Sequence, residues 1–154
     1  MDYHKVIHHY LQKIIETARP SYPGEQFLPL VDTSPMVDRW LAYAAGLGFF
    51  GRNHCLIHPR YGSFVTIGSI LTTLSLTPDE PLTLHCGSCR ECLIRCPGRA
   101  IGEKRLDPFR CKSYLTQKKE ELSPEEMQIL QRTPYIFGCD ECQRFCPFNQ
   151  KALP

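Results

Sequence analysis

The sequence predicts an α+β chain made of two differently organised parts, residues 1–80 and 81–154. Three observations support this fold class. Residues 3–45 contain segments with helical and strand-like hydrophobic spacing, residues 63–76 are rich in β-branched side chains, and cysteines crowd the second part. A chain of 154 residues has the length of an ordinary domain and can bury a core.

The chain begins with a segment that has the spacing of an amphipathic helix. Residues 3–17 place apolar side chains on one helical face, and the prolines and glycine of "RPSYPGE" end the segment. These apolar residues are Val6, Tyr10, Leu11, Ile14 and Ile15. The next stretch, "FLPLVD", predicts a short buried strand that ends at Asp32, with Pro29 tolerated only at a sheet edge or a bulge.

A second helix is predicted over residues 34–45. Thr33 or Ser34 can cap this helix, and Pro35 fits its first turn. Gly46 follows the last apolar position and should end the helix. Trp40 is expected in the core rather than at a cofactor.

The remaining segments have weaker patterns. The glycines of "GLGFFGRN" match neither the dinucleotide-binding nor the Walker spacing, so a plain turn is favoured over a phosphate-binding loop. Residues 63–76 should supply strand, interrupted at Gly68. Two polar helices are expected at 111–121 and 124–132, the second beginning at "SPEE".

Composition and charge exclude several classes of protein. No apolar run is long enough to cross a bilayer, and the N-terminal stretch lacks the pattern of a secretory signal. The net charge of +2 is too small to predict a nucleic-acid-binding surface by itself. A cytoplasmic location is therefore expected, and in that reducing compartment nine cysteines indicate metal ligation rather than disulfides.

The cysteine spacing is the strongest functional signal. In "CGSCRECLIRCPGRAI" the spacing is C-x2-C-x2-C-x3-C, and a proline follows the last cysteine. The four positions are Cys86, Cys89, Cys92 and Cys96. This is the bacterial ferredoxin pattern, in which the first three thiolates bind one [4Fe–4S] cluster and the fourth binds the neighbouring cluster.

A second cysteine group completes the prediction of two clusters. The stretch "CDECQRFCPF" supplies Cys139, Cys142 and Cys146 but lacks the first position of the pattern. Its missing ligand is either Cys111 or Cys55, and Cys111 is preferred because it lies between the two groups at the start of an expected helix. The assignment gives cluster 1 to Cys86, Cys89, Cys92 and Cys146, and cluster 2 to Cys96, Cys111, Cys139 and Cys142.

Two alternatives stay open from the residues alone. Structural zinc also uses C-x2-C pairs, but it is usually bound by two separated pairs rather than by runs of three cysteines. Cys55, flanked by His54 and His58, is either a metal ligand or a buried thiol, and the second is the commoner fate of such a residue.

Beyond its cysteines, the sequence resembles the epoxyqueuosine reductases, cobalamin-dependent iron–sulfur enzymes of tRNA modification that are related to reductive dehalogenases. The resemblance runs, in the family's order, through "DYHKVI", "VDTSPMVDRWLAYAAGLGFFGRNHCLI", "YGSFVTIGSILT", "CGSCRECLIRCPGRAI", "RCKSYLT" and "YIFGCDECQRFCPFN". It implies reduction of epoxyqueuosine to queuosine in tRNA, with electrons passing from a reducing donor through two [4Fe–4S] clusters to cobalamin. A monomer without membrane contact is expected.

The same resemblance gives roles to parts of the chain. Residues 1–80 would be the C-terminal part of a cobalamin-binding reductase domain, and residues 81–154 a ferredoxin-like double-cluster domain. The family's N-terminal portion and its C-terminal helical repeats are expected to be missing. Asp32, in the family's D-[ST]-x-P motif, would donate a proton to the leaving oxygen, whereas from its position alone it would cap a helix. The alternative function is a non-catalytic two-cluster electron carrier.

Overall fold

The computed structural model describes residues 2–150 and 152, which form two compact units. The first unit combines the chain up to Gly48 with Val65–Leu82. The second combines Phe49–Phe64 with the chain from Thr83 onward. The sequence division at residue 80 placed residues 49–64 in the first part, whereas in the structure they pack with the cysteine-bearing unit.

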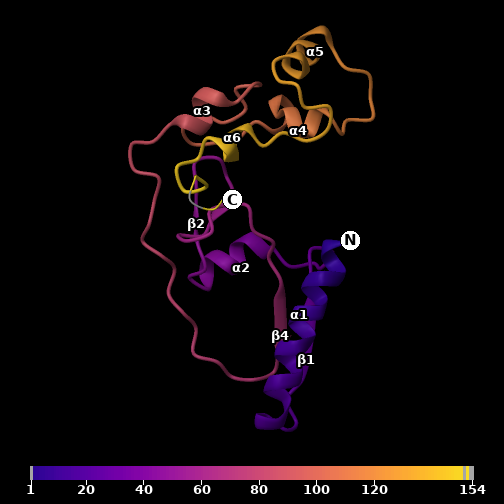
Figure 1. Ribbon diagram of the computed structural model, residues 1–154, viewed down its shortest axis with the longest axis vertical. Helices are drawn as coiled ribbons and strands as arrows, with labels where there is room; N and C mark the ends of the chain where they lie inside the picture. Colours follow the sequence, from indigo (N-terminus) through magenta and orange to yellow (C-terminus); the bar gives the residue numbers. More distant parts are fainter. Residues whose placement is uncertain (1, 151, 153–154) are drawn as a thin grey trace. The chain divides into compact units, whose positions relative to one another are not determined.

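The first unit is built on one long helix and a two-stranded sheet (Figure 1). Helix α1, Tyr3–Ala18, continues into the 3-10 turn η1, Arg19–Ser21, and packs against β1, Phe27–Leu30. Strand β1 pairs antiparallel with β4, Ser69–Thr72. Because each strand of this sheet is an edge strand among the described residues, Pro29 is tolerated within β1, as expected.

Helix α1 buries fewer apolar residues than its spacing predicts. Leu11 and Ile15 are buried, but Tyr10 and Ile14 are more than half exposed. Gly68 allows the close approach on the buried side, because a Cβ at this position would lie 2.6 Å from a methyl carbon of Ile7. The predicted helix is thus confirmed, and only part of its predicted apolar face is buried.

The second helix begins later than the sequence suggests. Helix α2 spans Asp38–Ala44, and its N-cap residue, Val37, makes no side-chain capping bond. The Ser34 hydroxyl accepts a hydrogen bond from the backbone of Met36, so the predicted cap forms a turn instead. Gly46 ends the helix in a left-handed conformation, φ +66°, as expected. Trp40 is 56% exposed, so its expected place in the core was wrong.

The second unit contains a short hairpin and several short helices (Figure 1). The hairpin pairs β2, Phe49–Phe50, with β3, Leu56–Ile57, and its turn begins within the "GLGFFGRN" stretch. The helices are α3, Glu91–Arg95; η2, Pro108–Arg110; α4, Lys112–Leu115; α5, Pro124–Gln131; and α6, Glu141–Arg144. Helix α3 packs on α6, and α4 packs on α5 and η2.

The two predicted polar helices differ in outcome. Helix α5 begins at Pro124 with a complete capping box between Ser123 and Glu126, as expected. Helix α4 ends at Leu115, well before the predicted residue 121. The Thr116 hydroxyl donates to the Ser113 carbonyl and accepts from the backbone of a distant glycine, so local side-chain bonds replace helical ones.

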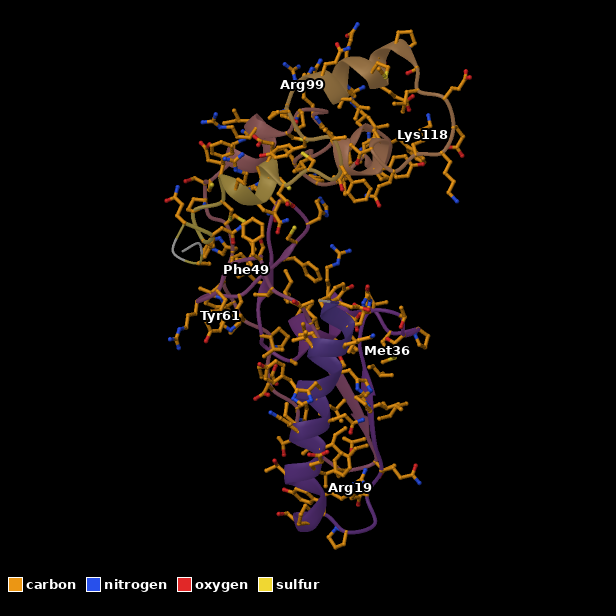
Figure 2. All side chains as sticks on the ribbon, turned by 45° about the vertical axis from the view of Figure 1, so that its right-hand side comes forward. Arg19, Met36, Phe49, Tyr61, Arg99 and Lys118 are labelled. Carbon is orange, nitrogen blue, oxygen red and sulfur yellow. The ribbon has the colours of Figure 1, made fainter. Side chains whose placement is uncertain are left out.

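The hairpin is fixed to the end of the chain by a small core. Phe49, Ile57 and Cys146 are buried together, with Phe148 packed beside them; Figure 2 labels Phe49 within this unit. Asn149 is fully buried, and its side-chain oxygen accepts a hydrogen bond from the backbone of Ser63 at 2.6 Å. Residues 49–64 therefore pack with residues that are made much later in synthesis.

Candidate metal centres and acid loop

The structure groups eight cysteines of the second unit around two separate cavities. The first cavity is lined by Cys86, Cys89, Cys92 and Cys146. The second is lined by Cys96, Cys111, Cys139 and Cys142. Each cavity thus receives four thiols, in the same two sets that the spacing argument proposed as ligands of clusters 1 and 2.

Two short helices connect the cavities. Helix α3 contains Cys92, which lines the first cavity, and ends directly before Cys96, which lines the second. Helix α6 contains Cys142, which lines the second cavity, and ends two residues before Cys146, which lines the first. Cys96 is the C-cap of α3 with an extended backbone, φ −64° and ψ 114°, because the following proline disfavours the helical conformation. The proline therefore directs this thiol away from its own group.

A close backbone contact brings Cys111 to the second cavity. Gly98 lies so near the carbonyl of Arg110 that a Cβ would sit 1.7 Å from its oxygen, so only glycine fits. The Arg110 guanidinium donates back to the Gly98 carbonyl at 3.0 Å. Cys111 follows directly after Arg110, and its thiol thus reaches the cavity that Cys96 lines.

Four of the thiols at these cavities have raised pKa values, so ionising them is unfavourable unless a positively charged metal core is bound. Burial, together with the neighbouring Cys86 thiol, raises the pKa of Cys92 to about 11. Burial also raises the pKa of Cys139 and of Cys146. For Cys142 the pKa is raised first by a hydrogen bond with Cys55 and then by burial. A bound cationic core would supply the charge that four adjacent thiolates need.

The walls of the cavities offer further donors that suit an anionic cluster. The backbone N–H of Arg52 donates to the Cys86 sulfur at 3.4 Å, and that of Ala100 donates to the Cys96 sulfur at 3.2 Å. The Nε atom of Arg52, in the wall of the first cavity, is buried without a hydrogen-bond partner among the described residues. These features fit clusters whose sulfur atoms accept hydrogen bonds.

Sequence reasoning missed two buried polar residues at these cavities. Lys112 lines the second cavity, is 1% exposed, and donates from Nζ to the carbonyls of Leu130 and Thr133 at 2.5 and 2.7 Å, at the C-terminal end of α5. Asn53 lines both cavities and is 7% exposed. No sequence pattern pointed to either residue, because their roles depend on segments distant in the chain.

Cys55 lies outside both sets of four. Its thiol approaches the carbonyl of Asn53 at 3.8 Å and hydrogen-bonds Cys142, but it is not among the described residues that line either cavity. Within residues 2–150, no three His, Cys, Asp or Glu side chains lie close enough to hold a single metal ion. The same part of the chain contains no helix long and apolar enough to cross a membrane.

Asp32 lies in the first unit on the loop after β1. Figure 2 shows Met36, on the same loop, at the N-terminal end of α1, with Arg19 at the other end. Asp32 has a left-handed backbone, φ +52°, which aspartate tolerates better than most residues. Its carboxylate accepts a hydrogen bond from the Tyr3 hydroxyl and lies 3.4 Å from Nε2 of His4. Because α2 begins at Asp38, Asp32 does not cap that helix.

The contacts of Asp32 determine its charge. The hydrogen bond from Tyr3 lowers the pKa of Asp32, and His4 lowers it further. The pKa of His4 is raised, chiefly by its hydrogen bond to Asp2 at 2.8 Å. Tyr3 and Asp32 face a cleft of about 290 Å³, where one carboxylate oxygen of Asp38 is buried without a hydrogen-bond partner among the described residues. The loop thus presents an ionised Asp32 with two proton-bearing neighbours.

Comparison with known proteins supports the prediction of clusters. Residues 85–149 match the family described as 4Fe-4S double cluster binding domain. The match supports the iron–sulfur interpretation of the cysteine spacing over the zinc alternative. The hairpin at residues 49–64, which packs with this region, lies outside the match.

The chain is similar to curated epoxyqueuosine reductases along nearly its whole length. It is 41% identical over 155 residues to the enzyme of Xanthomonas campestris pv. campestris, an alignment that covers 98% of this chain and 42% of that enzyme. It is 40% identical over 152 residues to the enzyme of Gloeobacter violaceus, covering 98% of this chain and 48% of the relative. The chain therefore spans less than half the length of these relatives.

Solved structures agree with this similarity. The epoxyqueuosine reductase of Streptococcus thermophilus matches 97% of this chain, at 34% identity and a TM-score of 0.86, over 40% of its own chain. An epoxyqueuosine reductase bound to an epoxyqueuosine-modified tRNA-Tyr stem loop matches 97% at 36% identity and a TM-score of 0.84, over 39% of its own chain. A Bacillus subtilis structure, with 33% identity, has an aspartate catalytic loop swung out of the active site. The resemblance indicated by the sequence motifs is confirmed.

Proposed function

We propose that this chain, which is similar to epoxyqueuosine reductases from its first helix to its last cysteine, carries electrons and protons for the reduction of epoxyqueuosine to queuosine in tRNA. The observation that carries this proposal is the grouping of eight thiols, four at each of two cavities, in a region that matches the double-cluster domain. We assign Cys86, Cys89, Cys92 and Cys146 to cluster 1, and Cys96, Cys111, Cys139 and Cys142 to cluster 2.

The chemistry of the reaction defines what the protein must supply. Converting an epoxide into an alkene takes two electrons and two protons, and the oxygen leaves as water. When bound, the two clusters supply the electrons one at a time. The short helices α3 and α6 would keep the two clusters adjacent, since each helix contains a proposed ligand of one cluster and is followed within two residues by a proposed ligand of the other.

We assign proton delivery to the loop of Asp32. The lowered pKa of Asp32 means that its carboxylate is ionised in the free protein, so it cannot act as an acid without first gaining a proton. His4, whose pKa is raised, and Tyr3 both contact this carboxylate. Asp32 would therefore pass on protons from these neighbours, which suits a reaction that needs two protons. The catalytic aspartate loop of the Bacillus subtilis structure supports a role for this kind of residue.

The remaining assignments follow from similarity. Cobalamin is implied by the resemblance alone, and no described residue is identified as its ligand, so no step is assigned to it. The unit that contains α1, β1 and β4 would form part of the cobalamin-binding domain. The tRNA-bound relative supports tRNA as the substrate. The cleft at Tyr3 and Asp32 would admit the modified base.

A segment exchange tests the proposal. The corresponding segment of the Xanthomonas campestris pv. campestris enzyme, 41% identical, is replaced by this chain, and epoxyqueuosine in tRNA is measured by mass spectrometry after reaction with a chemical reductant. Conversion to queuosine is expected, and the same hybrid with Cys86→Ala should be inactive. A hybrid that holds both clusters and cobalamin yet converts no substrate would favour the alternative, a two-cluster electron carrier.

A further inference from the structure

We propose that the turn between β2 and β3, residues 51–55, tunes the cluster potentials: Arg52 lines the first cavity, Asn53 lines both cavities, and together they would set the potentials of the clusters bound there. This inference rests on the cluster assignment of the proposed function. It concerns residues outside the matched domain at residues 85–149. The turn belongs to the same compact unit as the cysteines.

Arg52 is placed to act on the first cluster. It lines the cavity of Cys86, and its backbone N–H donates to the Cys86 sulfur at 3.4 Å. Its guanidinium is held by the Gly87 carbonyl at 2.9 Å and by Glu103 at 3.2 Å, both through terminal nitrogens. The inner nitrogen, Nε, is buried without a partner among the described residues, so it is available to a cluster sulfur.

Asn53 is placed to act on both clusters. It is the one asparagine among the described residues that lines both cavities, and it is 7% exposed. Its Nδ2 donates to the carbonyl of Cys142 at 3.2 Å, and its Oδ1 accepts from the backbone of Cys55 at 3.2 Å. The bond to the Cys142 carbonyl orients the peptide group that follows Cys142, a proposed ligand of cluster 2. Asn53 therefore fixes the position of Cys142 and the direction of this peptide dipole.

Backbone hydrogen bonds and a closely packed glycine hold the turn in the conformation in which Asn53 is buried. The backbone of Gly51 donates to the Cys55 carbonyl at 3.0 Å, and the backbone of His54 donates to the Gly51 carbonyl at 2.9 Å. A Cβ on Gly51 would lie 2.6 Å from Oδ1 of Asn53, so glycine is needed for this packing. His54 adopts a left-handed conformation, φ +61°, which is unfavourable for most residues and persists only where the surroundings enforce it.

Electrostatics gives the sign of the effect. Reduction adds negative charge to a cluster, so nearby donors and cations favour the reduced form, and nearby anions disfavour it. Removing the Arg52 charge should lower the potential of the first cluster. A carboxylate at the position of Asn53 should lower both potentials, because the residue lines both cavities. A neutral truncation there should lower mainly the second, because it removes the donor to the Cys142 carbonyl.

The test measures both midpoint potentials by redox titration with electron paramagnetic resonance, in iron-loaded protein at about pH 8, where a buried carboxylate is more fully ionised. The variants are Arg52→Gln, Asn53→Asp and Asn53→Ala. Arg60→Gln is the matched arginine control, since Arg60 is in the same hairpin and lines neither cavity. Gln128→Glu places the same charge at an exposed amide of this unit, which also lines neither cavity.

Arg52→Gln is expected to reduce the ratio of reduced to oxidised first cluster about tenfold at a fixed potential, a shift of ~59 mV for one electron. Asn53→Asp should shift both clusters downward, and the two controls should shift them less. Wild-type protein that does not take up two clusters would overturn the cluster assignment itself. If the wild type loads, and the Arg52 and Asn53 variants keep its potentials or match the controls, the inference is wrong while the proposed function stands.

Discussion

Replacing Cys111 gives a direct measure of how the thiols are divided between the two cavities. Cys111 is the second cavity's one cysteine from outside the two spaced groups, and it arrives through the contact between Gly98 and Arg110. In Cys111→Ala the second cavity keeps three of its four thiols, and the first cavity loses none. One cluster should therefore be lost, and iron should fall from about eight to about four per chain, since each cluster holds about four irons.

Iron and sulfide analysis of the purified variant measures this loss, and electron paramagnetic resonance identifies the cluster that remains. Alanine is used because a serine hydroxyl can replace a thiolate. Cys55→Ala is the matched control. It should retain about eight irons, because Cys55 lines neither cavity and contacts the second set of thiols only through a hydrogen bond with Cys142. The opposite result, full iron in Cys111→Ala with half in Cys55→Ala, would make Cys55 the fourth ligand and refute the assignment.

Four further predictions follow from the described contacts. In the enzyme hybrid, Asp32→Asn should keep both clusters and cobalamin while reducing conversion of epoxyqueuosine by about 10²-fold or more, and an unchanged rate would remove Asp32 from the mechanism. Lys112→Met should lower stability by about 3 kcal/mol, because two charge-assisted hydrogen bonds of a buried ammonium are lost. Lys118→Met, which removes an ion pair with Glu126 at the surface, should have a much smaller effect, and the urea midpoint for loss of cluster absorbance compares the two variants. The bond to Asp2 raises the pKa of His4, so it stabilises the folded state fully below about pH 6.5, the ordinary histidine pKa. This stabilisation is lost as the pH rises through the folded-state pKa of His4. In an NMR titration, Asp2→Asn should lower the pKa of His4. The chain by itself should take up cobalamin weakly, because binding energy comes from enclosing most of a ligand and residues 1–80 would form only part of the cobalamin-binding domain. Tight stoichiometric uptake measured by equilibrium dialysis would contradict this.

The cysteine pattern predicted the composition of both cavities because cluster ligation depends on local spacing. In each group, three thiols lie close together in the sequence, in or directly beside one turn and one short helix. The proline after Cys96 determines the direction of the Cys96 thiol, the fourth of the first group. The choice of Cys111 over Cys55 came from chain order, and the structure places Cys111 at the second cavity for a reason invisible in a single sequence: Gly98 admits the Arg110 carbonyl. The ligand roles themselves remain proposals.

A local side-chain bond and partners distant in the chain explain the features that the sequence did not predict. The "TSPM" stretch has the residues of a helix start, but its serine bonds the backbone of Met36 and the helix begins at Asp38. Trp40 has a core-like character, yet it is more than half exposed in the described chain. The Lys112 ammonium and the Nδ2 atom of Asn53 donate to carbonyls 18 to 89 positions away, so no local pattern identifies these residues.

The order in which the ribosome makes the chain has a consequence for the hairpin at residues 49–64. This hairpin packs in a core with Cys146 and Phe148, and its backbone at Ser63 is held by Asn149. At a synthesis rate of about 5–20 residues per second, these partners emerge several seconds after the hairpin itself. During that interval Phe49 and Ile57 lack their buried environment, so the nascent chain presents an apolar surface that a chaperone can bind.

The first cavity also depends on the last cysteine of the chain. The first cavity is completed only when Cys146 has been made, and Cys146 belongs to the same core as the hairpin. Closure of this core and completion of the first cavity are thus one late event in the maturation of the protein. If residues 81–154 were expressed without residues 1–80, they would lack the hairpin that packs against Cys146 and Phe148. The cysteine-bearing segment therefore does not contain all of its own core.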